Sequence, residues 1–229
     1  MIISRTPLRI SLAGGGSDLP AFFHEEAGCV VSATIDKYVY LTVNPKYDGA
    51  VRVSYSHTEN VGRVSEVEHP LVRACLELAG IRRGIEVVSV ADLPHGTGLG
   101  SSSAFTVGLL TALYAHSGEF RPADAIAHDA CRVEIELCRQ PIGKQDQYAA
   151  AMGGLRCYTF RPDGGVSSEL IPLHNETRTD LMAYLLLLDT GLRRDASTIL
   201  AGHDMRDSRK RANVRAMVTL PPQRAFVER

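Results

Sequence analysis

The stretch PHGTGLGSSSA, residues 94–104, places the strongest constraint on how this chain folds. It lies between a segment rich in β-branched residues, GIEVVSVADLP, and an apolar run that begins FTVGLLTALYA. The first segment is typical of a β-strand. In the second, the spacing of Phe105, Leu109, Ala112 and Leu113 predicts a helix over residues 102–116. We therefore expect a strand, a glycine-rich loop and a helix in direct succession.

The loop has glycine at three alternate positions, followed by a run of three serines. Glycine adopts positive φ without strain, so successive N–H groups can point into one concavity, to which the helix adds the positive end of its dipole. This predicts a phosphate site, although a flexible glycine turn with a serine helix cap explains the same residues. A P-loop fits poorly because Ser101, rather than lysine, follows Gly100. The residues expected to bind the phosphates are Pro94, Gly96, Gly98, Leu99, Gly100, Ser101, Ser102 and Ser103.

Length, charge and cysteine content limit the class of protein. A chain of 229 residues with 45% hydrophobic residues can form one large domain or two small ones. The formal net charge of -1 does not favour nucleic acid or an anionic membrane as a partner. The sequence shows no secretory leader and no run long enough to span a membrane, so we expect a cytoplasmic protein. The five cysteines include no C-x-x-C pair and favour reduced thiols.

The rest of the chain alternates between strand and helix patterns, and a domain boundary is plausible between residues 165 and 180. Several elements are expected: a strand from Ile2 into the turn at Gly14; a strand pair, 29–46 and 50–57, joined by a turn; a helix over 69–81; a helix over 122–138; a loop and short apolar turn over 139–154, leading to a strand that ends at 160; a buried strand over 182–189; and a basic helical stretch from about Arg193.

Three charged residues are candidates for chemistry. Asp146 follows a loop containing proline and glycine and precedes the small, apolar segment AAAMGG; it is either a general base or a turn aspartate. Arg9 lies within a strand, which is unfavourable unless the guanidinium is paired or exposed at an edge. Glu134 falls beside the apolar face of its helix, where a buried carboxylate needs a partner such as a hard cation, whereas an exposed one is simply solvated.

Four separated motifs, in order, resemble those of the GHMP small-molecule kinase superfamily. They are RTPLRISLAGGGSDLPAFF, IDKYVYLTV, GTGLGSSSAFTVGLL and PIGKQDQYAAAMGGL, and together they are most similar to the heptose 7-phosphate kinases of its sugar-phosphate branch. The resemblance implies an α+β fold. Residues 1–175 would form the GHMP kinase N-terminal domain, a two-layer arrangement of a sheet with helices that binds ATP and substrate. Residues 176–229 would begin an incomplete C-terminal α+β domain.

The same resemblance implies an activity. ATP, with Mg²⁺, would phosphorylate the anomeric hydroxyl of a sugar phosphate, D-glycero-D-manno-heptose 7-phosphate, giving the 1,7-bisphosphate used in lipopolysaccharide biosynthesis. Sugar 1-kinases of the fucose or galactose type remain alternatives. By resemblance, Asp146 and Arg9 are catalytic, and Ser101, Ser102 and Glu134 bind the metal. The residues implied to bind the sugar phosphate are Gly15, Gly16, Ser17, Asp18, Lys144 and Gln145.

The sequence departs from the family pattern at its C-terminal end. A second glycine-rich motif, of the GAGGGG type, is absent after Gly202. A catalytically silent nucleotide-binding protein is therefore a second hypothesis. An incomplete second domain would also leave apolar surface exposed, which predicts self-association or association with another polypeptide.

Overall fold

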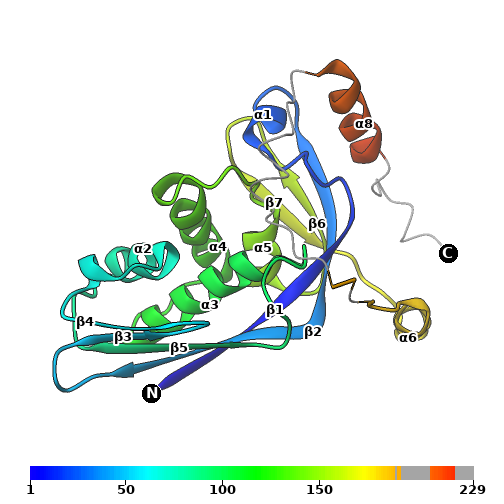
Figure 1. Cartoon of the computed structure of the whole chain (residues 1–229). Coiled ribbons are helices and arrows are strands. Elements are labelled where there is room, and N and C mark those ends of the chain that lie inside the picture. The colour runs from blue at the N-terminus through cyan, green and yellow to red at the C-terminus, as the bar shows by residue number, and fades with distance from the viewer. Residues whose placement is uncertain (189, 192–206, 220–229) are drawn as a thin grey trace.

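The computed structural model describes residues 1–188, 190–191 and 207–219. Its strands are β1 (Ile2–Ala13), β2 (Gly28–Pro45), β3 (Val51–Ser54), β4 (Thr58–Val61), β5 (Ile85–Ala91), β6 (Leu155–Phe160) and β7 (Val166–Leu170). They form a sheet in the order β4-β3-β5-β2-β6-β7, with β1 paired to β2 outside this path. Helices lie on one face of the sheet, which confirms the expected α+β class (Figure 1).

The long strand β2 organises the sheet. It pairs with β1 along almost all of that strand, with β6 through Gly28–Ala33, and with β5 through Val39–Pro45. The expected pairing of β2 with the next strand is wrong: β3 lies on the far side of β5 and runs parallel to it. The turn at residues 46–49 is present, but β2 and β3 do not pair with each other, because β5 lies between them and pairs with both. A local turn signal does not reveal such an insertion.

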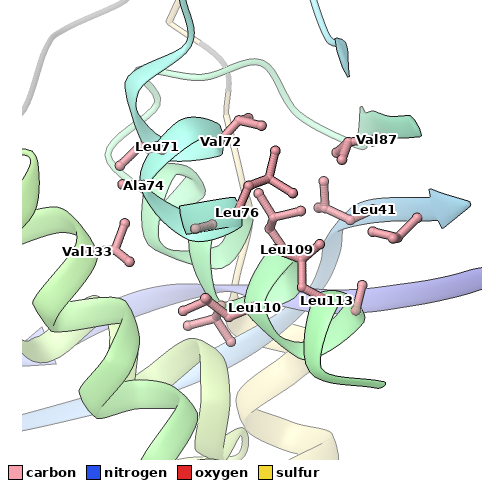
Figure 2. Packing of buried hydrophobic residues seen from close by; sticks show 14 of the residues in the cluster. Leu41, Leu71, Val72, Ala74, Leu76, Val87, Leu109, Leu110, Leu113 and Val133 are labelled. Carbon is pink, nitrogen blue, oxygen red and sulfur yellow. The ribbon is translucent and has the colours of Figure 1, made fainter. Parts of the chain in front are cut away.

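The helices that cover the sheet are α2 (Pro70–Leu78), α3 (Ser101–His116), α4 (Ala123–Cys131) and α5 (Gln145–Met152). Their apolar side chains meet those of the sheet in one core, where Leu76, Leu109, Leu110 and Leu113 are fully buried (Figure 2). Burying such a side chain stabilises the fold by about 1.5–3 kcal/mol. The predicted helix over 102–116 is confirmed, but it is buried on more than the one face that its apolar spacing indicated.

Helix α3 packs closely on β1 because it has no side chain at Gly108. A Cβ at this position would lie 2.6 Å from Thr6 Oγ1, and the Ser4 hydroxyl donates a 2.8 Å hydrogen bond to the Gly108 carbonyl. This close approach holds the middle of α3 against β1, the strand that carries Arg9.

The predicted helix over 122–138 is present in two parts: α4 is followed by a π-helical segment, Arg132–Leu137. The wider turn is a common feature of functional sites, and here it carries Glu134. The expectation of a loop and short turn before β6 is wrong, since residues 145–152 form α5. The alanine-rich segment AAAM has high helix propensity, and the helix is completed by contacts with α3 and α4.

The C-terminal part differs most from expectation. The buried strand expected over 182–189 is wrong for the described part, residues 182–188: α6 spans Asn175–Tyr184, and Leu185–Leu188 are exposed. A leucine run without a partner strand has no ladder to join. The basic stretch from Arg193 begins outside the described residues. In the described part of the chain, no helix combines the length and the apolar character needed to span a bilayer.

A last helix, α8 (Ser208–Thr219), returns to the N-terminal part and lies beside α1 (Pro20–Phe23) (Figure 1). Val214 of α8 is buried in a small cluster with Leu19 and Phe22. Glu26 accepts hydrogen bonds from Arg211 and Arg215 of α8. The C-terminal helix is therefore attached to the segment that follows the Gly14–Asp18 loop.

Candidate active site

A cavity of about 1210 Å³ opens between the glycine loop, the end of β1 and the start of α5. Its polar lining includes Arg9, Ser11, Asp18 and Asp146, together with the three serines at the start of α3. Residues from six separate segments of the sequence therefore meet on one surface. Arg9 is the single lysine or arginine among the described residues that line it.

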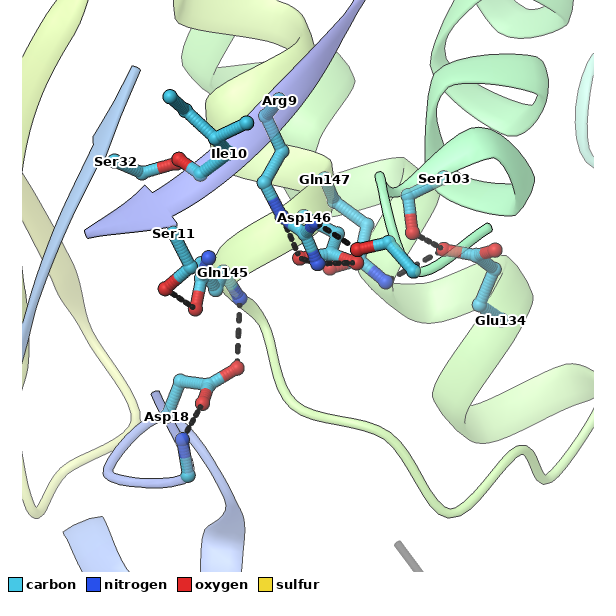
Figure 3. A network of polar contacts seen from close by, with 12 residues as sticks. Arg9, Ile10, Ser11, Asp18, Ser32, Ser103, Glu134, Gln145, Asp146 and Gln147 are labelled. Atoms are coloured by element: carbon cyan, nitrogen blue, oxygen red, sulfur yellow. Dashed lines mark hydrogen bonds and ion pairs between the residues drawn. The ribbon is translucent and has the colours of Figure 1, made fainter. Parts of the chain in front are cut away.

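The glycine loop has the backbone that its sequence predicted. Gly96, Gly98 and Gly100 have φ values of 78°, 76° and 75°, a region that side chains with a Cβ rarely occupy. Gly100 is the N-cap of α3 and provides no side-chain cap. The expected serine capping is therefore wrong, and Figure 3 shows Ser103 directed at Glu134 instead. The first turn of α3 faces the cavity with its positive dipole end, a good environment for an anion.

Arg9 and Asp146 form a two-bond ion pair across the cavity wall (Figure 3). Arg9 Nε donates to Asp146 Oδ1 at 2.8 Å, and Nη2 donates to Oδ2 at 2.6 Å. The Arg9 side chain also donates to the Gly98 carbonyl at 2.6 Å, and its backbone N–H donates to the Leu99 carbonyl at 3.0 Å. The expectation that this strand arginine is paired is confirmed. Through it, the candidate base is connected directly to the glycine loop.

Glu134 lies behind the serines, with 0% of its surface exposed. Ser102 Oγ donates to Oε1 and Ser103 Oγ donates to Oε2, each at 2.7 Å, and Gln147 Nε2 donates to Oε2 as well. Burial raises the pKa of this carboxyl, while the three hydrogen bonds act in the opposite direction. The solvated alternative for Glu134 is excluded by its burial. Gln147 Oε1 is buried without a hydrogen-bond partner.

Asp18 connects the two loops expected to bind the sugar. Its Oδ1 accepts from the Gly16 N–H at 3.0 Å, and its Oδ2 accepts from the Gln145 N–H at 3.1 Å (Figure 3). Burial raises the pKa of this carboxyl. A Cβ on Gly143 would lie 1.8 Å from Asp18 Oδ2, so glycine is required at that position for the two loops to approach. Asp18 thus holds the start of α5, which carries Asp146, against the Gly14–Asp18 loop.

The remaining residues expected to bind substrate fall into two groups: some line the cavity, and the side chains of the others make contacts elsewhere. Gly15, Gly16 and Gln145 line the cavity. Ser17 is fully buried, and its hydroxyl donates to the carbonyls of Gly14 and Cys29. Lys144 Nζ donates to the Gly164 carbonyl at 2.8 Å and lies 5.1 Å from the centre of the Phe23 ring. In this conformation its ammonium group is directed at the 162–164 turn.

Sequence reasoning missed the apolar part of the cavity. Tyr55, His69, Leu71 and Phe105 line it, and the His69 ring stacks on Phe105 with centroids 5.3 Å apart. Burial lowers the pKa of His69, so the neutral ring is favoured. These residues come from segments that are distant in the chain. From the sequence alone, an aromatic residue or a leucine in such a segment cannot be distinguished from an ordinary core residue. An amphipathic wall of this kind accepts a planar organic ring.

Comparisons with known proteins agree with this geometry. Residues 67–154, which include the glycine loop, α3 and Asp146, match the family model described as the GHMP kinases N terminal domain. A solved structure of a D-glycero-D-manno-heptose 1-phosphate kinase from Bacteriodes thetaiotaomicron superposes with a TM-score of 0.72 at 26% identity. The match covers 77% of this chain and 61% of that one.

Two curated relatives have the same kind of partial match. The D-glycero-alpha-D-manno-heptose 7-phosphate kinase of Campylobacter jejuni is 30% identical over 214 residues, which are 86% of this chain and 62% of that protein. The galactokinase of Thermotoga maritima is 27% identical over 184 residues, 75% of this chain and 49% of that protein. The chain thus spans less than two thirds of the length of these relatives.

Proposed function

Because residues 67–154 of this chain are a GHMP kinase N-terminal domain, we propose that the protein is a sugar kinase, which transfers the γ-phosphoryl group of ATP to a sugar hydroxyl. One observation carries the proposal: a single cavity joins the glycine loop, the first turn of α3 and the Arg9–Asp146 pair. Phosphoryl transfer requires these three parts, a phosphate cradle, local positive potential and a group that orients the acceptor.

In this proposal the glycine loop and the N-terminus of α3 bind the phosphates of ATP. In the loop that begins at Pro94, the three glycines Gly96, Gly98 and Gly100 offer backbone N–H groups without a side chain in the way, and Ser101, Ser102 and Ser103 add hydroxyls at the helix terminus. Arg9 is held at the Gly98 carbonyl and places positive charge between this loop and the acceptor side. The apolar wall around His69 and Phe105 would receive the base of the nucleotide.

Asp146 would orient the acceptor hydroxyl and take its proton as the oxygen bonds to phosphorus and ADP leaves. Both carboxylate oxygens accept from Arg9, so one of these hydrogen bonds must open or be shared when the hydroxyl binds. A correctly placed acid or base contributes about 10²–10⁴ in rate. Arg9 would then remain beside the transferring group as its positive partner.

The chemistry of the donor set fits Mg²⁺, because Ser101, Ser102 and Glu134 offer only oxygen atoms, the ligand type this cation prefers. Both Glu134 oxygens already accept hydrogen bonds from neighbouring side chains, so the carboxylate would exchange one of these for the metal. Within the described residues no cluster of three acidic, histidine or cysteine side chains occurs, so phosphate oxygens and water would complete the coordination. Magnesium would neutralise phosphate charge in the transfer.

We further propose that the acceptor is D-glycero-D-manno-heptose 7-phosphate, phosphorylated at its anomeric hydroxyl in the cytoplasm on the route to nucleotide-activated heptose and lipopolysaccharide. The identity to the Campylobacter jejuni kinase supports this choice. Gly15, Gly16, Asp18 and Gln145 would bind the sugar, with Ser17 as a support for their loop. Lys144 would reach a substrate phosphate only by leaving the Gly164 carbonyl.

The test is phosphoryl transfer from ATP with Mg²⁺ to a panel of acceptors: heptose 7-phosphate, fucose and galactose, with products identified by mass spectrometry. We expect heptose bisphosphate from the wild type and a loss of at least about 10²-fold in Asp146→Asn. Asp92→Asn is the matched control, since Asp92 lines the same cavity but accepts from the Tyr38 N–H. Equal turnover of the wild type and Asp146→Asn would remove Asp146 from the mechanism.

One observation favours a second function, that of a nucleotide-binding protein without turnover. Both Asp146 oxygens already accept hydrogen bonds from Arg9, so in this conformation neither is free to take the proton of an acceptor hydroxyl. ATP binding measured by calorimetry, together with the absence of product from every acceptor in the panel, would select this second function.

A further inference from the structure

Two cysteines outside the cavity lie side by side in the sheet. Cys29 of β2 and Cys157 of β6 are diagonal neighbours, since Val31 is the partner of Cys157 in the ladder. Their Sγ atoms are 3.0 Å apart, and both residues are partly exposed. Of the other cysteines, Cys75 and Cys131 are buried. A dissolved oxidant can therefore reach this pair.

The backbone at Cys29 supports the loop expected to bind substrate. The Cys29 N–H donates to Ser17 Oγ at 3.0 Å, and that hydroxyl donates in turn to the carbonyls of Cys29 and Gly14. The contact leaves no free space: a Cβ on Gly14 would lie 1.9 Å from the Cys29 carbonyl oxygen, and one on Gly28 would lie 2.0 Å from the Ser17 carbonyl oxygen. A displacement of β2 at Cys29 must therefore move the Gly14–Asp18 loop.

We propose that Cys29 and Cys157 are a redox modification site: a peroxide closes them to a disulfide, and closure loosens the Gly14–Asp18 loop on β2. The bond needs an S–S distance of about 2.05 Å, roughly 1 Å less than the present separation. Diagonal positions in an antiparallel ladder are farther apart than the usual span of a disulfide, so β2 and β6 must be drawn together. Such a bond is strained and readily reduced, as a reversible modification requires.

The chemistry balances with one peroxide per pair. The Cys157 sulfur attacks a peroxide oxygen to give a sulfenic acid and one water, and the Cys29 sulfur displaces the hydroxyl as a second water while the S–S bond forms. Two thiols are oxidised and hydrogen peroxide is reduced to two waters. The hydrogen bond from the Cys29 thiol lowers the pKa of Cys157 and so favours the reactive thiolate. Disulfides in a reducing compartment are mostly transient and redox-sensing.

The first measurement is independent of the proposed kinase activity, since only the assignment of the Gly14–Asp18 loop to substrate binding rests on the proposed function. The full chain is treated with stoichiometric hydrogen peroxide, and non-reduced peptides are mapped by mass spectrometry. We expect a peptide linked through Cys29 and Cys157 that dithiothreitol separates. It should be absent from Cys29→Ser and Cys157→Ser and unchanged in Cys138→Ser, a matched control at another partly exposed thiol. Separate sulfinic acids, or a link through another cysteine, would overturn the proposal.

The second measurement follows hydrogen exchange of the peptide that contains residues 14–18. We expect several-fold faster exchange in the oxidised chain, reversed by dithiothreitol, and no change in the glycine loop at 94–104. Peroxide-treated Cys157→Ser should exchange like the untreated wild type. A disulfide that forms without changing exchange at 14–18 would overturn the proposed coupling to the loop.

Discussion

At the scale of the residue, Glu134 is a buried carboxylate whose surroundings can be tested without any ligand. Three donors surround it, and the Gln147 carboxamide that supplies one of them has its own oxygen unpaired. In Glu134→Gln, rotation of the Gln147 carboxamide would let the new N–H group donate to Gln147 Oε1. The serine that faces the new amide nitrogen would accept a hydrogen bond instead of donating one, so each contact is retained while a buried charge, which is costly without a charged partner, is removed.

We therefore predict that Glu134→Gln unfolds at the same or a higher temperature than the wild type at pH 8. Because burial raises the pKa of Glu134 above 4.5, its ionised form destabilises the fold at high pH, and this cost disappears as the pH falls through the raised pKa. The difference in unfolding temperature between the variant and the wild type should therefore be smaller at pH 5 than at pH 8. The measurement is thermal unfolding at pH 8 and pH 5, with exposed Glu136→Gln as the control. A variant less stable at both pH values would contradict the prediction.

Gly98 and Gly100 of the glycine loop have the same backbone conformation but different surroundings, so substitutions at the two positions distinguish backbone strain from a side-chain clash. Gly98 and Gly100 have nearly equal φ values, 76° and 75°, so alanine at either position costs about 1–2 kcal/mol of backbone strain. A Cβ at Gly98 meets nothing within 4 Å, whereas one at Gly100 lies 3.3 Å from Arg9 Cγ and 3.4 Å from Asp146 Oδ2.

We predict that Gly100→Ala destabilises the chain more than Gly98→Ala does and that it alone disturbs the Arg9–Asp146 pair. Urea unfolding of both variants measures the difference, and adding Arg9→Ala to each tests its origin. Gly100→Ala should lower the free energy of unfolding by more than Gly98→Ala does, and this difference between the two variants should become smaller when Arg9→Ala is also present. An equal cost for the two alanines would show that the contact with Arg9 has no energetic role.

At the scale of the element, α8 depends on charge for its attachment to α1. Glu26 accepts hydrogen bonds from two α8 arginines, and its pKa is lowered chiefly because of Arg215. A carboxyl with a lowered pKa stabilises the docked state above its ordinary value of 4.5, and that contribution is lost as the pH falls through the lowered value. The apolar cluster around Val214 does not titrate.

We predict that Glu26→Gln increases hydrogen exchange in α8 without changing exchange in α3. High salt should have the same effect on the wild type and a smaller effect on the variant, which keeps the ion pair between Arg211 and Glu25, because exposed ion pairs are screened. Glu119→Gln, which removes an ion pair to Arg121 elsewhere, is the control. If α8 exchanges equally in Glu26→Gln and the wild type, Glu26 does not hold the helix, and the Val214 cluster and the Arg211–Glu25 ion pair are sufficient to do so.

Elements also show what local patterns could predict. The strand–loop–helix unit at 85–116 is present as expected because its alternation and helical spacing agree with its tertiary surroundings. The leucines of 181–188 predicted a buried strand, but part of that segment continues α6 and the rest is exposed. Burial depends on whether another element covers a segment, and hydrophobic residues alone do not specify that.

At the scale of the whole molecule, large apolar side chains are exposed together at the end of α6 and just beyond it. Met182, Tyr184, Leu186 and Leu188 are 65%, 88%, 79% and 73% exposed. Contiguous apolar surface of this kind marks an interaction site in a folded chain. We propose that two copies of the chain associate through it.

We predict that the mass measured by light scattering rises with protein concentration in the wild type. Leu186→Lys combined with Leu188→Lys should keep the chain monomeric over the same range. The control is Tyr47→Lys, which changes an apolar side chain that is 99% exposed elsewhere on the surface. A wild type that stays monomeric at every concentration would rule out self-association, and association that persists in the Leu186→Lys, Leu188→Lys variant would assign it to another surface.

The sequence by itself determined the glycine loop and the helix behind it, because these follow from local backbone freedom and helical spacing. For Arg9 and Glu134 it left two alternatives, a partner or exposure to solvent, because only a buried charge needs a partner. The tertiary structure decided which partners they have. Arg9 meets Asp146 across 137 positions, and Ser103 meets Glu134 across 31. The insertion of β5 between β2 and β3, the π-helical turn and the meeting of Cys29 with Cys157 were likewise decided by packing. Contacts between distant segments depend on how whole elements cover one another, and one-dimensional spacing carries no record of that.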